Sequence, residues 1–111
     1  MKLLFLCSQN KSRSLTAEKV FDGYEGHESK SAGTETNARI KVTEGMIGWA
    51  DIVFCMEKKH LRRLRATYAE AIRDKQVDVL NICDDYEYMD EELIVLLESA
   101  VGEVLAEKKS V

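Results

Sequence analysis

The sequence predicts an α/β fold in which a four-stranded parallel sheet lies between two layers of helices, a three-layer sandwich. Four short apolar runs of strand length alternate along the chain with stretches of helical periodicity. Strands separated by helices pair in parallel through right-handed crossovers. The third run, residues 52–56, is almost entirely apolar, as expected of a strand buried on both faces. No proline, repeat or linker divides the 111 residues, so we expect residues 1–111 to form one domain.

The elements are expected in a regular order. The four apolar runs predict strands at residues 2–7, 28–32, 52–56 and 77–82. A helical stripe follows the first strand at Ala17, Val20, Phe21 and Tyr24. Trp49 lies in a second helical stretch, and a third stripe holds Leu61, Leu64, Tyr68, Ala71 and Ile72. Asp90 is a suitable N-cap for a last helix with apolar residues at Leu93, Leu96, Leu97, Ala100, Val101, Val104 and Leu105.

Polar residues that suit phosphate chemistry join the first strand to the first helix. They are Cys7, Ser8, Gln9, Asn10, Lys11, Ser12, Arg13 and Ser14. A thiol attacks as its thiolate, which a helix N-terminus and a nearby cation favour. Backbone N–H groups at a helix start cradle phosphate, and the arginine fork matches two phosphate oxygens. The segment therefore predicts a nucleophile within a phosphate site, against the alternative of an inert, buried Cys7 at a strand end.

These residues resemble the signature of the low-molecular-weight protein tyrosine phosphatase family, in which a cysteine, five residues, an arginine and a serine or threonine follow the first strand. Residues 31–34 (Ser-Ala-Gly-Thr) match the segment after that family's first helix, and residues 50–56 look like its third strand with the closing methionine. Asp84-Asp85-Tyr86 resembles its Asp-Pro-Tyr acid loop. The resemblance covers most of the chain and implies the strand order 2-1-3-4 of the phosphatase fold.

The resemblance implies a phosphomonoester hydrolase, of protein tyrosine phosphatase type, that works through a cysteinyl phosphate without metal or cofactor. Cys7 would attack phosphorus while Arg13 and the N–H groups of residues 8–14 hold the phosphoryl oxygens. Asp84, or less favourably Asp85, would be the general acid. Asp85 and Tyr86 would line the substrate cleft, although an acidic loop before a helix and a core-edge tyrosine are the alternatives. Both Cys7 and Asp84 follow strands whose carboxyl ends share one rim.

Three positions depart from the family pattern. Gln9 replaces a glycine at a position where a positive φ would suit glycine best. Ser12 replaces a second cysteine, which removes the partner for a protective disulfide with Cys7. Asp85 replaces the proline after the acid. The chain is also shorter than typical members, and the expected losses are substrate-binding loops.

Composition narrows the setting in which the protein works. A net charge of -4 argues against a nucleic-acid partner, and no apolar run approaches the length of a membrane span. Three scattered cysteines suit a reducing compartment, so we expect a cytoplasmic protein. Cys55 is expected in the core, whereas Cys83 is structural or, less favourably, redox-active. His27 and His60 have no visible ligand partner and are expected at the surface.

The basic run Lys58, Lys59, Arg62, Arg63 and Arg65 predicts a solvated helix face, with docking of an acidic phosphoprotein as the weaker interpretation. Expected substrates are a phosphotyrosine protein or a small aryl or alkyl phosphate, with inorganic phosphate or vanadate as ligands. Three rival functions remain: an arsenate reductase of the same fold, a IIB-type phosphocarrier, and a phosphate-binding module without turnover. The reductase needs two further cysteines close together, whereas Cys55 and Cys83 are far apart in the sequence.

Overall fold

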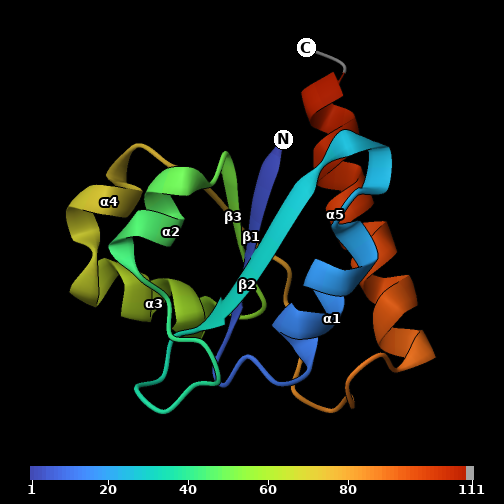
Figure 1. Ribbon diagram of the computed structural model, residues 1–111, viewed down its shortest axis with the longest axis horizontal. Helices are drawn as coiled ribbons and strands as arrows, with labels where there is room; N and C mark the ends of the chain where they lie inside the picture. Colours follow the sequence, from blue (N-terminus) through green and yellow to red (C-terminus); the bar gives the residue numbers. More distant parts are fainter. Residues whose placement is uncertain (110–111) are drawn as a thin grey trace.

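The computed structural model describes residues 1–109, which contain a parallel sheet of four strands in the order β2-β1-β3-β4 (Figure 1). The strands are β1 (Lys2–Cys7), β2 (Glu28–Gly33), β3 (Ile52–Cys55) and β4 (Gln76–Val79). All three neighbouring pairs are parallel, so the predicted class and strand order are confirmed. Within residues 1–109, the structure has no helix of sufficient length and apolar character to span a membrane.

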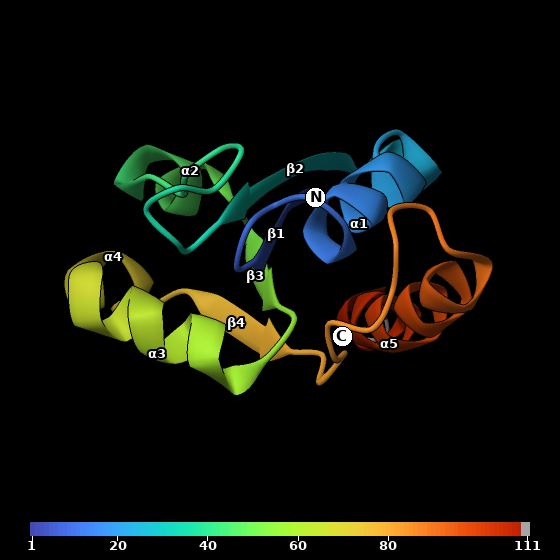
Figure 2. The same cartoon turned by 90° about the horizontal axis from the view of Figure 1, so that it is seen from below.

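Helices cover both faces of the sheet and complete the three layers (Figure 2). They are α1 (Arg13–Phe21), α2 (Glu44–Trp49), α3 (Lys58–Thr67), α4 (Ala69–Arg73) and α5 (Glu91–Lys109), with a short 3-10 turn, η1 (Tyr24–Gly26). Helices α1 and α5 pack on one face, whereas α2, α3 and α4 pack on the other. The predicted cap of the last helix is present, because Asp90 Oδ1 accepts the backbone N–H of Glu92 at 2.8 Å.

The core is divided by the alternation of side chains along β1. Leu3, Phe5 and Cys7 belong to the buried cluster under α1 and α5, whereas Leu4 and Leu6 belong to the cluster under α2, α3 and α4. The four apolar side chains, Leu3, Leu4, Phe5 and Leu6, are completely buried. A strand buried on both faces fixes its register firmly, because a slip of one residue would exchange the two faces. The end of β1, and with it Cys7, is therefore held in one position.

Two predicted elements end earlier than expected. The fourth strand ends at Val79 rather than at residue 82, because Asn81 turns the chain in the left-handed conformation with φ 56°. The first helix ends at Phe21, and Tyr24 lies beyond it in η1 with half of its surface exposed, so its expected place on the helical stripe is wrong. Gly23 has φ 84°, a conformation that favours glycine and separates the two segments.

The carboxyl ends of the strands meet at one edge of the sheet. The N–H of Thr34 donates to the carbonyl of Cys7 at 2.9 Å, and the N–H of Ile82 donates to that of Met56 at 2.9 Å. A Cβ atom at Gly33 would lie 2.5 Å from the carbonyl oxygen of Ser8, which is too close for any other residue. The end of β2 therefore packs directly on the loop that follows Cys7.

Candidate active site

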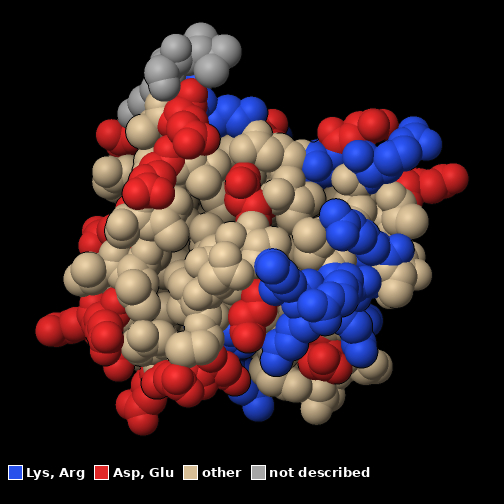
Figure 3. Space-filling model, turned by 180° about the vertical axis from the view of Figure 1, so that it is seen from behind, with Lys and Arg blue, Asp and Glu red and all other residues tan. Residues whose placement is uncertain are grey.

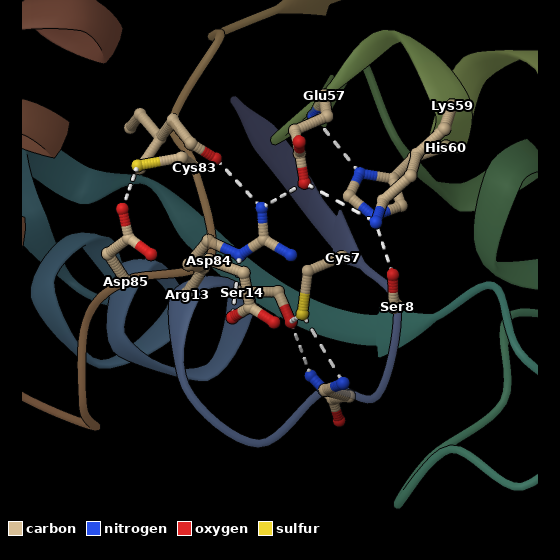
Figure 4. A network of polar contacts seen from close by, with 12 residues as sticks. Cys7, Ser8, Arg13, Ser14, Glu57, Lys59, His60, Cys83, Asp84 and Asp85 are labelled. Carbon is tan, nitrogen blue, oxygen red and sulfur yellow. Dashed lines mark hydrogen bonds and ion pairs between the residues drawn. The ribbon is translucent and has the colours of Figure 1, made fainter.

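Cys7 ends β1 with its sulfur inside the loop formed by residues 8–12. Its side chain is 3 % exposed, and Sγ lies 2.9 Å from Ser14 Oγ and 3.3 Å from the backbone N of Asn10 (Figure 4). Ser14 Oγ also accepts a hydrogen bond from Asn10 Nδ2 at 2.8 Å, which leaves its own proton to be donated to the sulfur. Helix α1 begins at Arg13, so the positive end of its dipole lies at the loop. Hydrogen-bond donors and the start of a helix thus converge on the sulfur.

The shape of the loop depends on Asn10. This residue is completely buried and has φ 59°, and its Nδ2 donates to the hydroxyls of Ser14 and Ser31 at 2.8 and 2.9 Å. Arg39 binds it from outside, donating to the Asn10 carbonyl at 3.0 Å and to Oδ1 at 2.9 Å. Asn10 is thus the residue of the loop that adopts the left-handed backbone conformation. The predicted need for a positive φ at Gln9 is wrong, because Gln9 is not among the residues with positive φ.

The backbone of the loop presents free donors. Among the residues that the structure describes, no acceptor is bonded to the backbone N–H groups of residues 8, 9 and 11–13. Their carbonyls behave differently, since those of Ser8, Gln9 and Ser12 each accept a backbone bond from elsewhere in the chain. With carbonyls bonded outward and N–H groups left free, the loop has the polarity of an anion-binding site.

Arg13 is nearly fully buried, with 1 % of its surface exposed, and is held in place from three directions. Its Nη1 donates to Glu57 Oε2 at 2.6 Å and to the carbonyl of Ile82 at 2.8 Å. Nε lies 3.5 Å from Asp84 Oδ1 without forming a hydrogen bond. Figure 4 shows its other terminal nitrogen on the side facing Cys7, with no dashed contact. That nitrogen and Nε remain available for a phosphate.

Glu57 and His60, at the start of α3, hold the other side of the loop. The hydrogen bond and charge of Arg13 lower the pKa of Glu57, so its carboxylate stays ionised. His60 is 1 % exposed, and burial together with Arg13 lowers its pKa to about 4. His60 Nδ1 accepts the N–H of Glu57 at 3.0 Å, so Nε2 carries the proton and donates to Ser8 Oγ at 3.0 Å.

The predicted loop residues line a cavity of about 210 Å³, which we call the reaction cavity. Its walls are Cys7, Ser8, Gln9, Lys11, Ser12, Arg13 and Asp84. Asp84 reaches it from the loop after β4 with 67 % of its side chain exposed. Asn10 and Ser14 lie buried behind the wall rather than on it. Every side chain of the wall is polar, and none is aromatic.

The two residues predicted for the substrate cleft lie outside these walls. Asp85 accepts a hydrogen bond from Cys83 Sγ at 3.1 Å, and this bond raises the pKa of that thiol. Tyr86 packs at the edge of the core under α5, which is the alternative arrangement considered for it. Their part in substrate binding stays a prediction. Cys55 is in the core as expected, with burial raising its pKa to about 12.

The surface positions predicted for the two histidines are wrong. His27 is 7 % exposed and lies 2.9 Å through Nδ1 from the N-terminal amine, while His60 supports the loop as described. Sequence reasoning assigned no role to Glu57 or Arg39, and it placed Ser31 in a matching segment without indicating its contact with Asn10. Glu57 could have been noticed because it follows β3 at the same edge of the sheet as Cys7. Arg39 carried no such signal, because it reaches Asn10 from a loop without regular structure.

Neither a family model nor a curated protein matches the chain. Solved structures do match it over nearly its whole length. The arginine phosphatase YwlE from Geobacillus stearothermophilus has 20 % identity and a TM-score of 0.72, with 98 % of this chain and 96 % of that chain covered. A low-molecular-weight protein tyrosine phosphatase from T. tengcongensis has 24 % identity and a TM-score of 0.75, with 97 and 99 % covered.

A protein tyrosine phosphatase from Entamoeba histolytica gives a similar result, with 20 % identity, a TM-score of 0.74, and 99 and 97 % of the two chains covered. The chain therefore has the fold of the low-molecular-weight phosphatases. Likeness at these identities establishes the arrangement of strands and helices. The chemistry depends on the residues that this chain places at the sheet edge.

Proposed function

We propose that the protein is a cytoplasmic phosphomonoester hydrolase of protein tyrosine phosphatase type that forms a cysteinyl phosphate on Cys7 without a metal or cofactor. One observation carries the proposal: the sulfur of Cys7 accepts the N–H of Asn10 and shares a cavity with Arg13 and with a loop whose N–H groups at residues 8, 9 and 11–13 have no bonded acceptor among the described residues. Such an arrangement binds a phosphate and presents it to the nucleophile at the same time.

In the first step the Cys7 thiolate attacks phosphorus, so that an S–P bond forms while the bond to the leaving oxygen breaks. Asp84, which borders the reaction cavity beside Arg13, gives a proton to that oxygen. Arg13 and the loop N–H groups hold the equatorial oxygens as their charge develops. In the second step water attacks phosphorus and Asp84 takes its proton. The S–P bond then breaks, phosphate leaves, and Ser14 stabilises the sulfur as it departs.

The geometry gives less support to the rival functions. A reductase relay needs thiols that can reach Cys7, but Cys55 is buried within β3 and Cys83 is bonded to Asp85. A carrier needs no arginine in its loop, whereas Arg13 here is held by Glu57 and the Ile82 carbonyl. A module that binds phosphate without turnover uses the same loop and differs only in the acid step.

Hydrolysis of p-nitrophenyl phosphate in the presence of EDTA tests the proposal. We expect turnover, and Cys7→Ser should lower it by more than about 10⁴-fold, because a hydroxyl replaces the activated thiolate. Mass spectrometry after an acid quench should find phosphate on Cys7. Full activity in Cys7→Ser would overturn the assignment of the nucleophile. Tight vanadate binding without hydrolysis would instead favour the binding module.

A further inference from the structure

A second cavity, which we call the basic cavity, opens next to the reaction cavity. It has a volume of about 420 Å³ and is lined by Glu57, Lys58, Lys59, Arg62, Asn81 and Cys83. Two of these residues connect it to residues that line the reaction cavity. Glu57 is bonded to Arg13, and Cys83 directly precedes Asp84 in the chain. A substrate held by Arg13 therefore lies beside the basic cavity.

The walls of the basic cavity carry three cationic side chains and one carboxylate. That carboxylate, Glu57, is already engaged by Arg13 at 2.6 Å. Among residues 1–109, Lys58 and Arg62 have no hydrogen bond or ion pair, although both are exposed at the cavity. Arg63, which does not line this cavity, is by contrast paired with Glu35 at 3.3 Å. The third cation of the wall, Lys59, lies 3.7 Å from Glu57, so Lys58 and Arg62 are the two lining cations without a bonded partner among the described residues.

The basic cavity is positively charged, although the chain as a whole has a net charge of -4. Figure 3 shows Lys and Arg gathered over one part of the surface, on the side of α3, while Asp and Glu gather on the side of α5. On a surface that only faces solvent, positively and negatively charged side chains would be expected to be interspersed. A hollow with cations on one side of a phosphate site instead attracts a second anion, because fields add within a concave surface.

The reaction cavity itself also favours an anionic ligand over an aromatic one. Lys11 lies on its wall, exposed and without a bonded partner among the described residues. The wall of this cavity itself holds no aromatic ring on which an aryl group could stack. Selectivity for the group that carries the phosphate must therefore come from charge and hydrogen bonding.

We propose that the substrate is a phosphomonoester with a second anionic group, a carboxylate or a phosphate, and that this group binds in the basic cavity between Lys58 and Arg62. The inference rests on the proposed function, because it assumes that Cys7 and Arg13 bind the first phosphate. Beyond that function, it specifies the chemical class of the substrate. A dianionic small molecule and a phosphopeptide with an acidic neighbour offer the same chemistry, and the experiment separates them.

Two matched substrate pairs test the inference. One pair is a phosphotyrosine peptide with Asp and Glu beside the phosphotyrosine and its counterpart with Asn and Gln. The other is hexane-1,6-diol bisphosphate and hexyl phosphate. We expect kcat/KM for one acidic member to exceed that of its neutral counterpart by about tenfold at low salt, and the ratio to fall as salt is added. The pair with the larger ratio identifies the source of the second anion.

A double variant, Lys58→Gln with Arg62→Gln, locates the second site. It should bring the ratio within the preferred pair close to one, and the neutral member serves as the internal reference. Arg65→Gln is the matched control, because it removes a cation from the same helix outside the basic cavity and should leave the ratio unchanged. A wild-type ratio near one in both pairs, or a ratio that survives the double variant, would overturn the inference.

Binding measurements keep this test separate from the proposed chemistry. Isothermal titration of Cys7→Ser with the same pairs reports affinity without turnover. If the wild type hydrolyses nothing but Cys7→Ser binds the acidic member about tenfold more tightly, the second-anion site stands and the proposed hydrolysis fails. If hydrolysis proceeds with no preference in rate or affinity, the proposed function stands and the second site is refuted.

Discussion

The loop after β1 and the loop after β4 both reach Arg13, but they are built differently. In the first, Asn10, Arg13 and Ser14 are at most 1 % exposed and are bonded to one another or to neighbouring elements. In the second, Asp84 is 67 % exposed, and within residues 1–109 its one polar contact is the 3.5 Å approach to Arg13. The second loop is tied down near its ends, through the Ile82 carbonyl and the N–H of Met89.

This contrast separates two tasks. Binding a phosphate in a fixed position requires donors that are already oriented, and the first loop supplies them as a consequence of folding. Proton transfer requires a carboxyl group that can approach a leaving oxygen, and an exposed side chain on a loosely held loop can move. Changes in the first loop should therefore affect both stability and activity, whereas changes at Asp84 should affect activity alone.

The largest expected effect is that of Arg13→Lys. Lysine keeps the charge but cannot bond Glu57, the Ile82 carbonyl and a phosphate together, because it lacks the planar fork. We expect kcat/KM for p-nitrophenyl phosphate to fall about 10³-fold and the free energy of unfolding to fall by about 2 kcal/mol. Steady-state kinetics and urea denaturation measure the two losses.

Arg63→Lys is the matched control for this prediction. Arg63 is half exposed and its ion pair with Glu35 lies at the surface, so the same exchange should change stability by less than about 0.5 kcal/mol. A large loss of activity in Arg13→Lys with unchanged stability would contradict the view that the phosphate site is built by folding.

Asp84→Asn should have the next largest effect, and on activity alone. We expect kcat to fall about 10²-fold for phenyl phosphate and less for p-nitrophenyl phosphate, because nitrophenolate leaves more easily without a proton. Stability should change by less than about 0.5 kcal/mol, since the side chain is mostly exposed. The dependence on the leaving group distinguishes a proton donor from a residue that only shapes the cavity.

Asp85→Asn is the control next to it. This change removes the negative charge beside Cys83 but keeps an oxygen that can accept its hydrogen bond, and we expect a loss of less than about threefold. If Asp85→Asn shows the large loss that depends on the leaving group while Asp84→Asn does not, the general acid is the second aspartate.

The sequence was sufficient for the fold because the pattern that defines it is local. The fully apolar β3 and the alternation of helical stripes imply a parallel sheet irrespective of the loops. The ends of strands and helices were harder to predict from the sequence. The end of β4 depends on a left-handed Asn81, and asparagine adopts that conformation only where its surroundings favour it.

The site was predictable where its residues are adjacent in sequence. Cys7, Asn10 and Ser14 were named from one short segment, and in the structure Ser14 contacts both of the others. Residues that act across the sheet were missed, because their role comes from tertiary packing. The residues next to His60 in the sequence are mostly charged, as in a helix at the surface. In the structure, however, His60 is buried under the loop and its ring is hydrogen-bonded to Ser8.

The smallest expected effect is a dependence of stability on pH that comes from His60. Its pKa is lowered to about 4 in the folded protein, below the ordinary value of 6.5. The unfolded chain therefore binds a proton between pH 6.5 and 4 while the folded chain does not, so stability falls as the solution becomes more acidic. We expect this group to remove about 2 kcal/mol between pH 7 and 5, as measured by urea denaturation.

His60→Gln separates this contribution from that of other groups. Glutamine can still donate to Ser8 but does not titrate, so the variant should lose the part of the slope between pH 7 and 5 that belongs to His60. Glu57 does not interfere in this range, because its lowered pKa confines its effect to more acidic solution, below its ordinary value of 4.5. Equal slopes for the wild type and the variant would mean that folding does not lower the pKa of His60. A hydrogen bond from a neutral His60 to Ser8 would then not support the loop after β1, whose remaining supports are the contacts of Asn10 and Arg13.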